Sequence, residues 1–306
     1  MLLKFFNEQA PTNIKRNWSI RNCLKNSRSL VVFTFTSLQH SLYANLSFKF
    51  KAANIKLARQ FFIFFVINFI TIQSSFTYAA TEIDTKKIIE YADRTRGAIP
   101  EGLEWTVKLT SIEEEETTDR EFFIKYKNND SYVESKAPVK YKGEIFLFKG
   151  RALWYFKPGL RAPISISSRQ KLSGAASNGD IASTNYSKDY TATFVKMDTV
   201  NNDECYQFHL KSNADDSTYD QIDYWISKKS GLALKADFLS LQGKTLKSAF
   251  FKYQNELTYK GEKFPFINEM KITDAKNPKN QSTLNYSLPR VVNHPESIFN
   301  VNNLKR

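Results

Sequence analysis

The strongest constraint on the fold is a run of short segments in which apolar and polar side chains alternate. The run begins near Trp105 and continues almost to the C-terminus. Alternation with a period of two places successive side chains on opposite faces of a β-strand. Turn residues such as Pro158-Gly159 and Lys260-Gly261 separate the segments, and consecutive strands joined by tight turns pair antiparallel. The pattern therefore predicts a mainly antiparallel β-sheet.

The predicted sheet is large. Well-defined candidate strands span residues 131–136, 144–149, 151–157, 190–197, 204–211, 219–227, 232–240, 244–254, 264–272 and 281–287. A sheet of about 11–12 strands has to curl, so we expect a mainly β fold with few helices, an incomplete antiparallel β-barrel in the form of a cupped sheet. One amphipathic helix is predicted over residues 83–95, with Thr81 or Asp84 as its N-cap.

The alternation is interrupted between residues 168 and 189. This stretch is small, polar and glycine-containing, and it has almost no bulky apolar side chain before Tyr186. Asn178-Gly179 is a turn sequence, and Asp180 can cap a short helix after it. We interpret the stretch as a helical and loop lid on the open side of the sheet, with Arg169, Asn178, Gly179 and Asp180 as its lid residues. An anion site beside Arg169 is the alternative interpretation.

Several predicted strands are apolar on both faces. In 144–149, for example, Ile145 and Leu147 alternate with Phe146 and Phe148. A sheet with one face in water shows polar residues on that face, so we expect both faces to be covered, one by a helix and the other by a lid or a ligand. The alternative is that these side chains merely complete a core. The residues predicted to bind lipid are Phe122, Ile124, Phe146, Phe148, Trp154, Phe156, Ile164 and Ile166.

The positive charge is concentrated at the N-terminus. The chain has a formal net charge of +13, but residues 1–79 contain ten Lys or Arg residues and a single acidic residue, Glu8. The remaining residues are nearly balanced, with 34 basic and 30 acidic side chains. A nucleic-acid-binding protein would carry its excess positive charge on the folded part, so nucleic acid is not an expected partner.

The N-terminal part contains the features of a secretion signal. Lys56 and Arg59 precede a largely apolar stretch of 12 residues, 61–72, and small residues follow at Thr77 and Ala79. Twelve helical residues span about 18 Å, less than the roughly 30 Å core of a bilayer. We therefore predict a signal peptide over 55–79, cleaved after Ala79 or after Ala80, and a single domain over 80–306. Residues 1–54 are either a mis-assigned start or a genuine extension.

The candidates for catalytic chemistry are few. Cys205 is the one cysteine after the predicted signal, and no cysteine lies at the cleavage site, so we expect an exported protein that is not lipid-anchored. His209 is expected at a strand surface and His294 in a loop. Cys205 and His209 lie about 13 Å apart along an extended strand, too far to share a metal. Without a nucleophile, phosphate-loop or metal motif, we predict no enzyme, metal or cofactor.

Several segments resemble those of a known family. They are residues 148–156 (FKGRALWYF), 161–164 (RAPI), 177–181 (SNGDI), 189–190 (DY) and 295–304 (PESIFNVNNL). They are similar to the outer-membrane lipoprotein-sorting family, the LolA/LolB-like periplasmic carriers, and more closely to its uncharacterised branch often associated with export pumps. The resemblance covers about residues 81–306.

The resemblance implies an incomplete β-barrel whose interior holds acyl chains, with helices in its open side. It also implies a lid that moves, and Arg169 is the candidate for the arginine that holds the lid in the well-studied carrier. We therefore expect a soluble periplasmic carrier of lipid or lipoprotein acyl chains, with an inner-membrane export pump as a candidate partner. The alternative is a periplasmic protein-binding sensor or pump-accessory module on the same fold. The oligomeric state is left open.

Overall fold

The computed structural model describes residues 83–182 and 185–304. All the described residues belong to one compact unit, Thr81–Arg306. The predicted N-terminal extension and signal peptide, 1–54 and 55–79, lie outside the described residues. Among the residues that the structure describes, no helix is both long and apolar enough to cross a membrane.

Most of the described chain is β-strand. The strands are β1 (Leu103–Glu113), β2 (Glu116–Lys127), β3 (Asp130–Ala137), β4 (Ile145–Lys149), β5 (Ala152–Phe156), β6 (Ile164–Ile166), β7 (Lys171–Ser173), β8 (Ala176–Ser177), β9 (Tyr190–Val200), β10 (Asp203–Ser212), β11 (Gln221–Ser227), β12 (Ala233–Leu239), β13 (Thr245–Lys252), β14 (Asn255–Tyr259), β15 (Glu262–Phe266), β16 (Glu269–Asp274) and β17 (Gln281–Val291). The helices are α3 (Thr85–Arg94), α4 (Tyr186–Asp189) and the 3₁₀ helices η2 (Val139–Tyr141), η3 (Asn178–Ile181), η4 (Glu296–Phe299) and η5 (Val301–Leu304).

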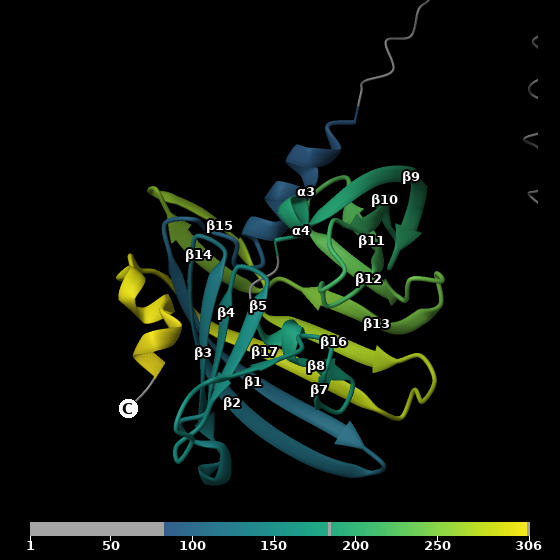
Figure 1. Cartoon of the computed structure of the whole chain (residues 1–306). Helices are drawn as coiled ribbons and strands as arrows, with labels where there is room; N and C mark the ends of the chain where they lie inside the picture. The colour runs from purple at the N-terminus through teal and green to yellow at the C-terminus, as the bar shows by residue number, and fades with distance from the viewer. Residues whose placement is uncertain (1–82, 183–184, 305–306) are drawn as a thin grey trace, which may run out of the picture. The chain divides into compact units, whose positions relative to one another are not determined.

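Thirteen strands form one antiparallel sheet in the order β6-β5-β4-β3-β2-β1-β17-β16-β13-β12-β11-β10-β9. The sheet is strongly curved and remains open (Figure 1), with β6 and β9 as its two edge strands. The predicted mainly β fold with an open, cupped antiparallel sheet is confirmed. The sheet has slightly more strands than the 11–12 expected.

The predicted strand 264–272 is wrong in its bounds, because at Ile267 the chain passes from a two-stranded sheet into the thirteen-stranded one. The Ile267 N–H donates to the carbonyl of Thr95 at 3.0 Å, and the Asn268 N–H donates to Lys252 at 2.9 Å. These bonds separate β15 from β16, and β15 pairs with β14 in a two-stranded sheet of its own. The position of this break depends on tertiary structure, because the Thr95 carbonyl that accepts from Ile267 lies far away in the sequence.

Helix α3 forms close to its predicted position. Asp84 is the N-cap, and its carboxylate accepts from the Lys87 N–H at 3.2 Å, which satisfies one of the free donors of the first turn. The apolar side of the helix buries Ile89 and Ala92 in the core, and Gly97 follows the helix with a φ of 112°. The helix therefore covers part of the inner face of the sheet.

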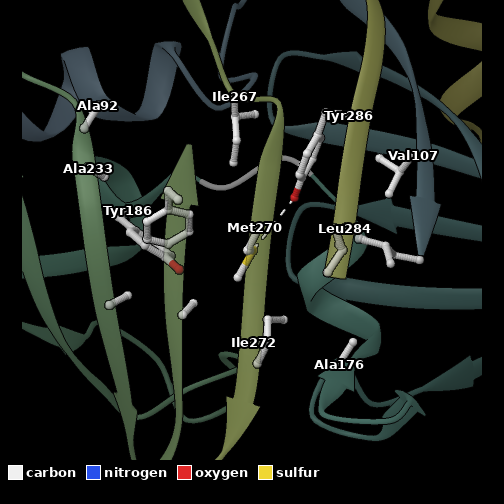
Figure 2. Close-up of a cluster of buried hydrophobic side chains, with 14 of the residues drawn as sticks. Ala92, Val107, Ala176, Tyr186, Ala233, Ile267, Met270, Ile272, Leu284 and Tyr286 are labelled. Carbon is white, nitrogen blue, oxygen red and sulfur yellow. Dashed lines mark hydrogen bonds between the residues drawn. The ribbon is translucent and has the colours of Figure 1, made fainter. Parts of the chain in front are cut away.

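The main core lies on the inner face of the sheet. It unites side chains of α3, of the central strands and of the segment that interrupts the alternation, including Ala92, Val107, Ala176, Met270 and Leu284. Figure 2 shows these side chains spread over the strands and the helix that carry them. Many of them are fully buried, so the interior in this structure is packed with protein side chains.

A second apolar cluster lies on the opposite, outer face. Leu147 and Phe156 of the sheet pack there against Phe299 and Leu304 of the C-terminal segment. This segment, η4 and η5, lies beside β3 and β4 (yellow in Figure 1). The apolar character of both faces of β4 and β5 therefore has a structural origin, because each face has its own cover.

Candidate functional site

The segment from β6 to β9 connects the two edges of the sheet. We call residues 167–182 and 185–189 the strap; it contains β7, β8, η3 and α4. It lies over the inner face, because its side chains Ala176, Ile181 and Tyr186 belong to the main core. The strap coincides with the predicted lid and is the candidate functional site.

The β7–β8 hairpin is seated on the middle of the sheet. Gly174, at its tip, has a φ of +54°, and a Cβ atom there would lie 2.7 Å from the Ser282 hydroxyl oxygen of β17. That hydroxyl accepts from the N–H groups of Ala175 and Ala176 at 2.9 and 3.1 Å. It also donates to the carbonyl of Ser173 at 3.0 Å. A glycine and a serine together allow the two backbones to approach this closely.

The next part of the strap is held by a buried charge pair. In η3 the Asp180 carboxylate accepts from the Ser177 N–H at 2.8 Å, closing a capping box. It also accepts from the Tyr219 hydroxyl at 2.7 Å and lies 3.4 Å from the ammonium group of Lys247 on β13. Lys247 donates in addition to the Ala175 carbonyl at 2.6 Å. The predicted capping role of Asp180 is wrong in its position: Asp180 does not precede a short helix but lies within η3, whose N-cap residue is Ser177.

The Tyr219 hydroxyl is a donor in this network. Burial, and then the nearby Asp180 carboxylate, raise the pKa of Tyr219 well above its ordinary value. The phenol consequently stays protonated and can donate to Asp180 at any physiological pH. This fixes the direction of the hydrogen bond that joins the strap to the start of β11.

The other predicted lid residues also make contacts that position the strap. A Cβ atom on Gly179 would lie 2.2 Å from the Thr218 hydroxyl oxygen, so only glycine fits there. The Asn178 amide donates to the Ser167 carbonyl at 3.1 Å. Arg169 donates to the Asp220 carboxylate at 2.7 Å and to the carbonyl of Asp215 at 2.8 Å.

The last part of the strap, α4, is bound to α3. The Ser187 N–H donates to the Asp93 carboxylate at 2.7 Å. Asp93 is almost fully buried, and burial raises its pKa from the usual 3.8 to about 6. Tyr186 packs edge-on against Tyr190 and Tyr224. The α4 end of the strap is thus attached by a buried carboxylate and packed among aromatic rings.

The predicted lipid-binding residues fall on both faces of the sheet. Direct cross-strand partners share a face, and the pairs Phe148–Leu153 and Leu147–Trp154 lie on opposite faces of β4 and β5. Residues in or against the main core are Phe122, Ile124, Phe146, Phe148 and Ile166. Trp154 and Phe156 belong to the outer cluster under the C-terminal segment, and Ile164 is exposed. The structure therefore does not bring the eight residues together.

A small cavity lies beneath the strap. Its volume is about 120 Å³, and its lining includes Arg96, Phe148, Tyr186, Tyr190 and Met270. A larger groove of about 710 Å³ lies near the β1–β2 hairpin, lined by Arg120, Tyr141 and several acidic residues. Neither has the apolar lining that an acyl chain requires, so such a chain needs a conformation in which the strap has moved.

Some residues that hold the strap were not among the predicted site residues. Lys247 is the clearest case, because it precedes Ala249 and Phe251 on the buried side of β13. A lysine on an apolar strand face is a signal for a buried partner. Asp93 and Tyr219 had no comparable signal, since their partners are distant in sequence.

The structure places Cys205, His209 and His294, the three residues considered for catalytic chemistry, in three separate surroundings. Cys205 is buried in a small outer cluster with Val200 and Trp225. His209 is partly exposed on its strand and lies 2.7 Å from the Asp223 carboxylate. His294 lies in an irregular segment, as expected, but it is buried against Phe299. Among residues 83–182 and 185–304, no group of three potential ligands could hold a metal ion.

Solved structures resemble this fold over most of their length. A LolA superfamily protein from Nitrosomonas europaea is 26% identical with a TM-score of 0.64, and the match covers 71% of this chain and 98% of that one. A putative outer membrane lipoprotein-sorting protein domain from Vibrio parahaemolyticus is 20% identical with a TM-score of 0.61, covering 72% and 98%. A DUF1329 family protein from Desulfovibrio piger is 17% identical with a TM-score of 0.60, covering 72% and 97%.

The sequence comparisons are consistent with the uncharacterised branch. Among curated proteins, no sequence matches this chain. A family model whose description reads "Uncharacterized protein" matches residues 127–306, more than half of the chain. The predicted resemblance is confirmed: the chain belongs to this family of uncharacterized proteins, and its fold is that of the LolA superfamily.

Proposed function

We propose that this protein is a periplasmic carrier that holds the acyl chains of a lipid or lipoprotein beneath the strap. One observation carries the proposal: a polar-anchored strap joins the two edge strands across the apolar inner face of an open sheet. The similar structures from Nitrosomonas europaea and Vibrio parahaemolyticus, described as a LolA superfamily protein and a putative lipoprotein-sorting domain, support the same role.

The strap is suited to reversible opening. Its attachments at Ser282, Asp180 and Arg169 are hydrogen bonds and ion pairs, which water can replace when the strap moves. The inner-face side chains beneath it are apolar, and each methylene group of a bound chain that they shield from water contributes roughly 0.8 kcal/mol. An acyl chain therefore stabilises an open conformation that is unfavourable without it.

A carrier of this kind uses no covalent chemistry. Binding and release depend on the apolar area that the cargo buries, so no catalytic group, metal or cofactor is required. We infer that the protein is not an enzyme. An export pump in the inner membrane remains a candidate source of the cargo, and nucleic acid is not a proposed partner.

A matched pair of variants tests the proposal. Phe148 lies on the inner face and Trp154 on the outer face of adjacent strands, and both are half-buried. We expect Phe148→Arg to weaken binding of a fluorescent fatty acid by about tenfold or more, because the guanidinium group is costly in apolar surroundings. Trp154→Arg should leave the affinity within about twofold. Wild-type protein that ignores the probe and co-purifies without lipid contradicts the proposal.

The N-terminal processing is a separate part of the proposal. Intact-mass spectrometry of the exported protein should show cleavage after Ala79 or Ala80 and reveal any lipid that co-purifies. A protein that retains residues 55–79 after export contradicts the signal-peptide prediction.

The packed interior favours a second candidate, a periplasmic protein-binding sensor or pump-accessory module. Phe122, Ile124 and Leu284 are fully buried by other side chains, as expected if the core is permanently filled. Such a module would bind its partner through the outer surface. A partner captured equally by wild-type and Phe148→Arg protein supports this function, whereas capture that depends on Phe148 supports the carrier.

A further inference from the structure

Arg96 is a buried cation beside the cavity beneath the strap. It follows α3 and is 6% exposed. Its guanidinium carbon lies 4.4 Å from the ring centre of Phe251 and 5.2 Å from that of Tyr186. One of its terminal nitrogens donates to the Tyr224 hydroxyl at 3.2 Å. The aromatic rings therefore hold the planar group in place while leaving it charged.

Arg96 has unused hydrogen-bonding capacity. Within residues 83–182 and 185–304, no carboxylate forms an ion pair with it, and its buried Nε atom has no hydrogen-bond partner. The nearby Asp93 directs one oxygen to the Ser187 N–H, and its other oxygen also lacks a partner. A buried guanidinium charge is costly unless an acceptor or anion pairs with it. The tyrosine hydroxyls of Tyr224 and Tyr186 accept from the terminal nitrogens, so the Nε–H group is the donor that lacks an acceptor.

The cavity provides room for such an acceptor. Arg96 belongs to its lining and is buried, whereas Arg151, also in the lining, is exposed; Arg96 thus marks the inner end and Arg151 the rim. The volume of about 120 Å³ exceeds the space of one water molecule. A carboxylate or phosphate group fits this space, and a large glycan does not.

Three carboxylates also belong to the cavity lining. Asp180 is engaged by Lys247, Tyr219 and the Ser177 N–H, so its charge is compensated. Asp189 is half-buried and Asp216 is exposed, which places them toward the rim. Burial raises the pKa of Asp189. The inner end of the cavity is therefore the favourable place for negative charge.

We propose that this cavity binds the anionic headgroup of an amphiphile, a phosphate or carboxylate that Arg96 contacts through its free Nε–H group. The inference rests on the proposed carrier function and specifies its cargo: a lipid with a small, negatively charged headgroup whose chains enter the apolar interior next to Phe148. A guanidinium group can bind either oxyanion through a charge-assisted hydrogen bond. Arg96 thereby distinguishes charged cargo from neutral cargo with the same chains.

Three soluble probes test the proposal by calorimetry on the processed protein. They are dihexanoyl phosphatidic acid, dihexanoylglycerol and inorganic phosphate. We expect the wild-type protein to bind the phosphatidic acid at least about tenfold more tightly than the neutral glyceride, as for one charge-assisted pair. Arg96→Gln should abolish this preference and leave the affinity for the glyceride within about twofold. Arg94→Gln, an exposed control at the end of α3, should retain the preference.

The outcomes separate the two proposals. Equal binding of both lipids by the wild-type protein overturns the headgroup site and leaves the carrier intact. Binding of inorganic phosphate without either lipid supports the anion site and contradicts the carrier. Binding of none of the probes overturns both. Because the wild-type preference is decisive by itself, the test remains valid if Arg96→Gln fails to fold; Arg96→Lys, which keeps the charge without the planar fork, should then show a reduced preference.

Discussion

Strands β4 and β5 are apolar on both faces, and the two faces are covered in different ways. On the outer face, Phe299 and Leu304 of the C-terminal segment pack directly against Leu147 and Phe156. On the inner face, the strap contributes some apolar side chains, but its attachments are hydrogen bonds and ion pairs, such as that of Asp180 with Lys247. The outer cover is joined mainly by apolar packing, whereas the inner one combines apolar side chains such as Ile181 with buried polar bonds.

This difference separates a structural cover from a releasable one. Apolar packing has no substitute in water, so lifting the C-terminal segment costs the full transfer free energy of its side chains. The polar groups of the strap can exchange their partners for water, and the net cost of each exchange is small. The inner cover is therefore the one that a ligand can displace.

The largest effect is expected from removing the centre of the outer cover. Phe299→Ala deletes a fully buried ring and should lower the free energy of unfolding by about 4 kcal/mol, measured by urea denaturation. Binding of a fluorescent fatty acid to the folded variant should remain unchanged. Val139→Ala, at a highly exposed apolar position, is the control and should change stability by less than about 0.5 kcal/mol. If folded Phe299→Ala protein loses fatty-acid binding, the distinction between a structural outer cover and a releasable inner cover is contradicted.

A smaller effect on the free energy of unfolding is expected from the Asp93 carboxylate, which accepts from an N–H group of α4, when the pH changes. Burial raises the pKa of Asp93 to about 6 in the folded protein, from 3.8. The folded state therefore binds an additional proton between pH 3.8 and about 6, and this group makes stability fall as the pH rises through that range. The fall amounts to about 3 kcal/mol above pH 6. Asp93→Asn should remove it.

The measurement is the difference in unfolding free energy between Asp93→Asn and wild type, taken from pH 4 to pH 8. The difference should shift in favour of the variant as the pH rises and level off above pH 6. Glu90→Gln, on the same helix but less buried, is the matched control. Parallel pH profiles for wild type and Asp93→Asn would show that Asp93 does not bear the burial cost inferred for it.

The steric fit of the strap should have a moderate effect. A methyl group at Gly179 meets the Thr218 side chain at 2.2 Å, so Gly179→Ala should cost about 2 kcal/mol. Amide hydrogen exchange should accelerate in the strap and stay unchanged in the C-terminal segment. Adding Thr218→Ala removes the closest atoms and should restore part of the loss. Equal acceleration of amide exchange in the strap and in the C-terminal segment would contradict the expectation that the two covers open independently.

The smallest effect is expected at the exposed ion pair of the strap. Arg169 and Asp220 are both partly exposed, so Arg169→Gln should cost only about 0.5 kcal/mol. The loss should disappear in about 1 M salt, where exposed charges are screened. Urea denaturation at low and high salt gives the comparison. A loss of several kcal/mol that persists in salt would make Arg169 a principal anchor of the strap, in line with the role implied by the family resemblance.

The local sequence pattern determined much of the secondary structure of this protein. The alternation of apolar and polar residues predicted the strands, the breaks at Pro158-Gly159 and similar turns predicted the hairpins, and Asp84 predicted the start of α3. The loss of alternation after residue 167 predicted a segment that leaves the sheet, although the helical turn there begins before Asp180 and not after it. These features depend on neighbours a few residues apart, which the sequence displays directly.

Only the tertiary structure decided which face of each strand is the inner one. Trp154 and Phe156 carry the same pattern as Phe146 and Phe148, but a C-terminal segment more than 130 residues away covers them. Likewise, Arg96 and Lys247 acquire their roles from aromatic and carboxylate groups on distant elements. On a strand that is apolar on both sides, alternation assigns residues to two faces but does not say what covers each face, because that depends on contacts between elements remote in sequence.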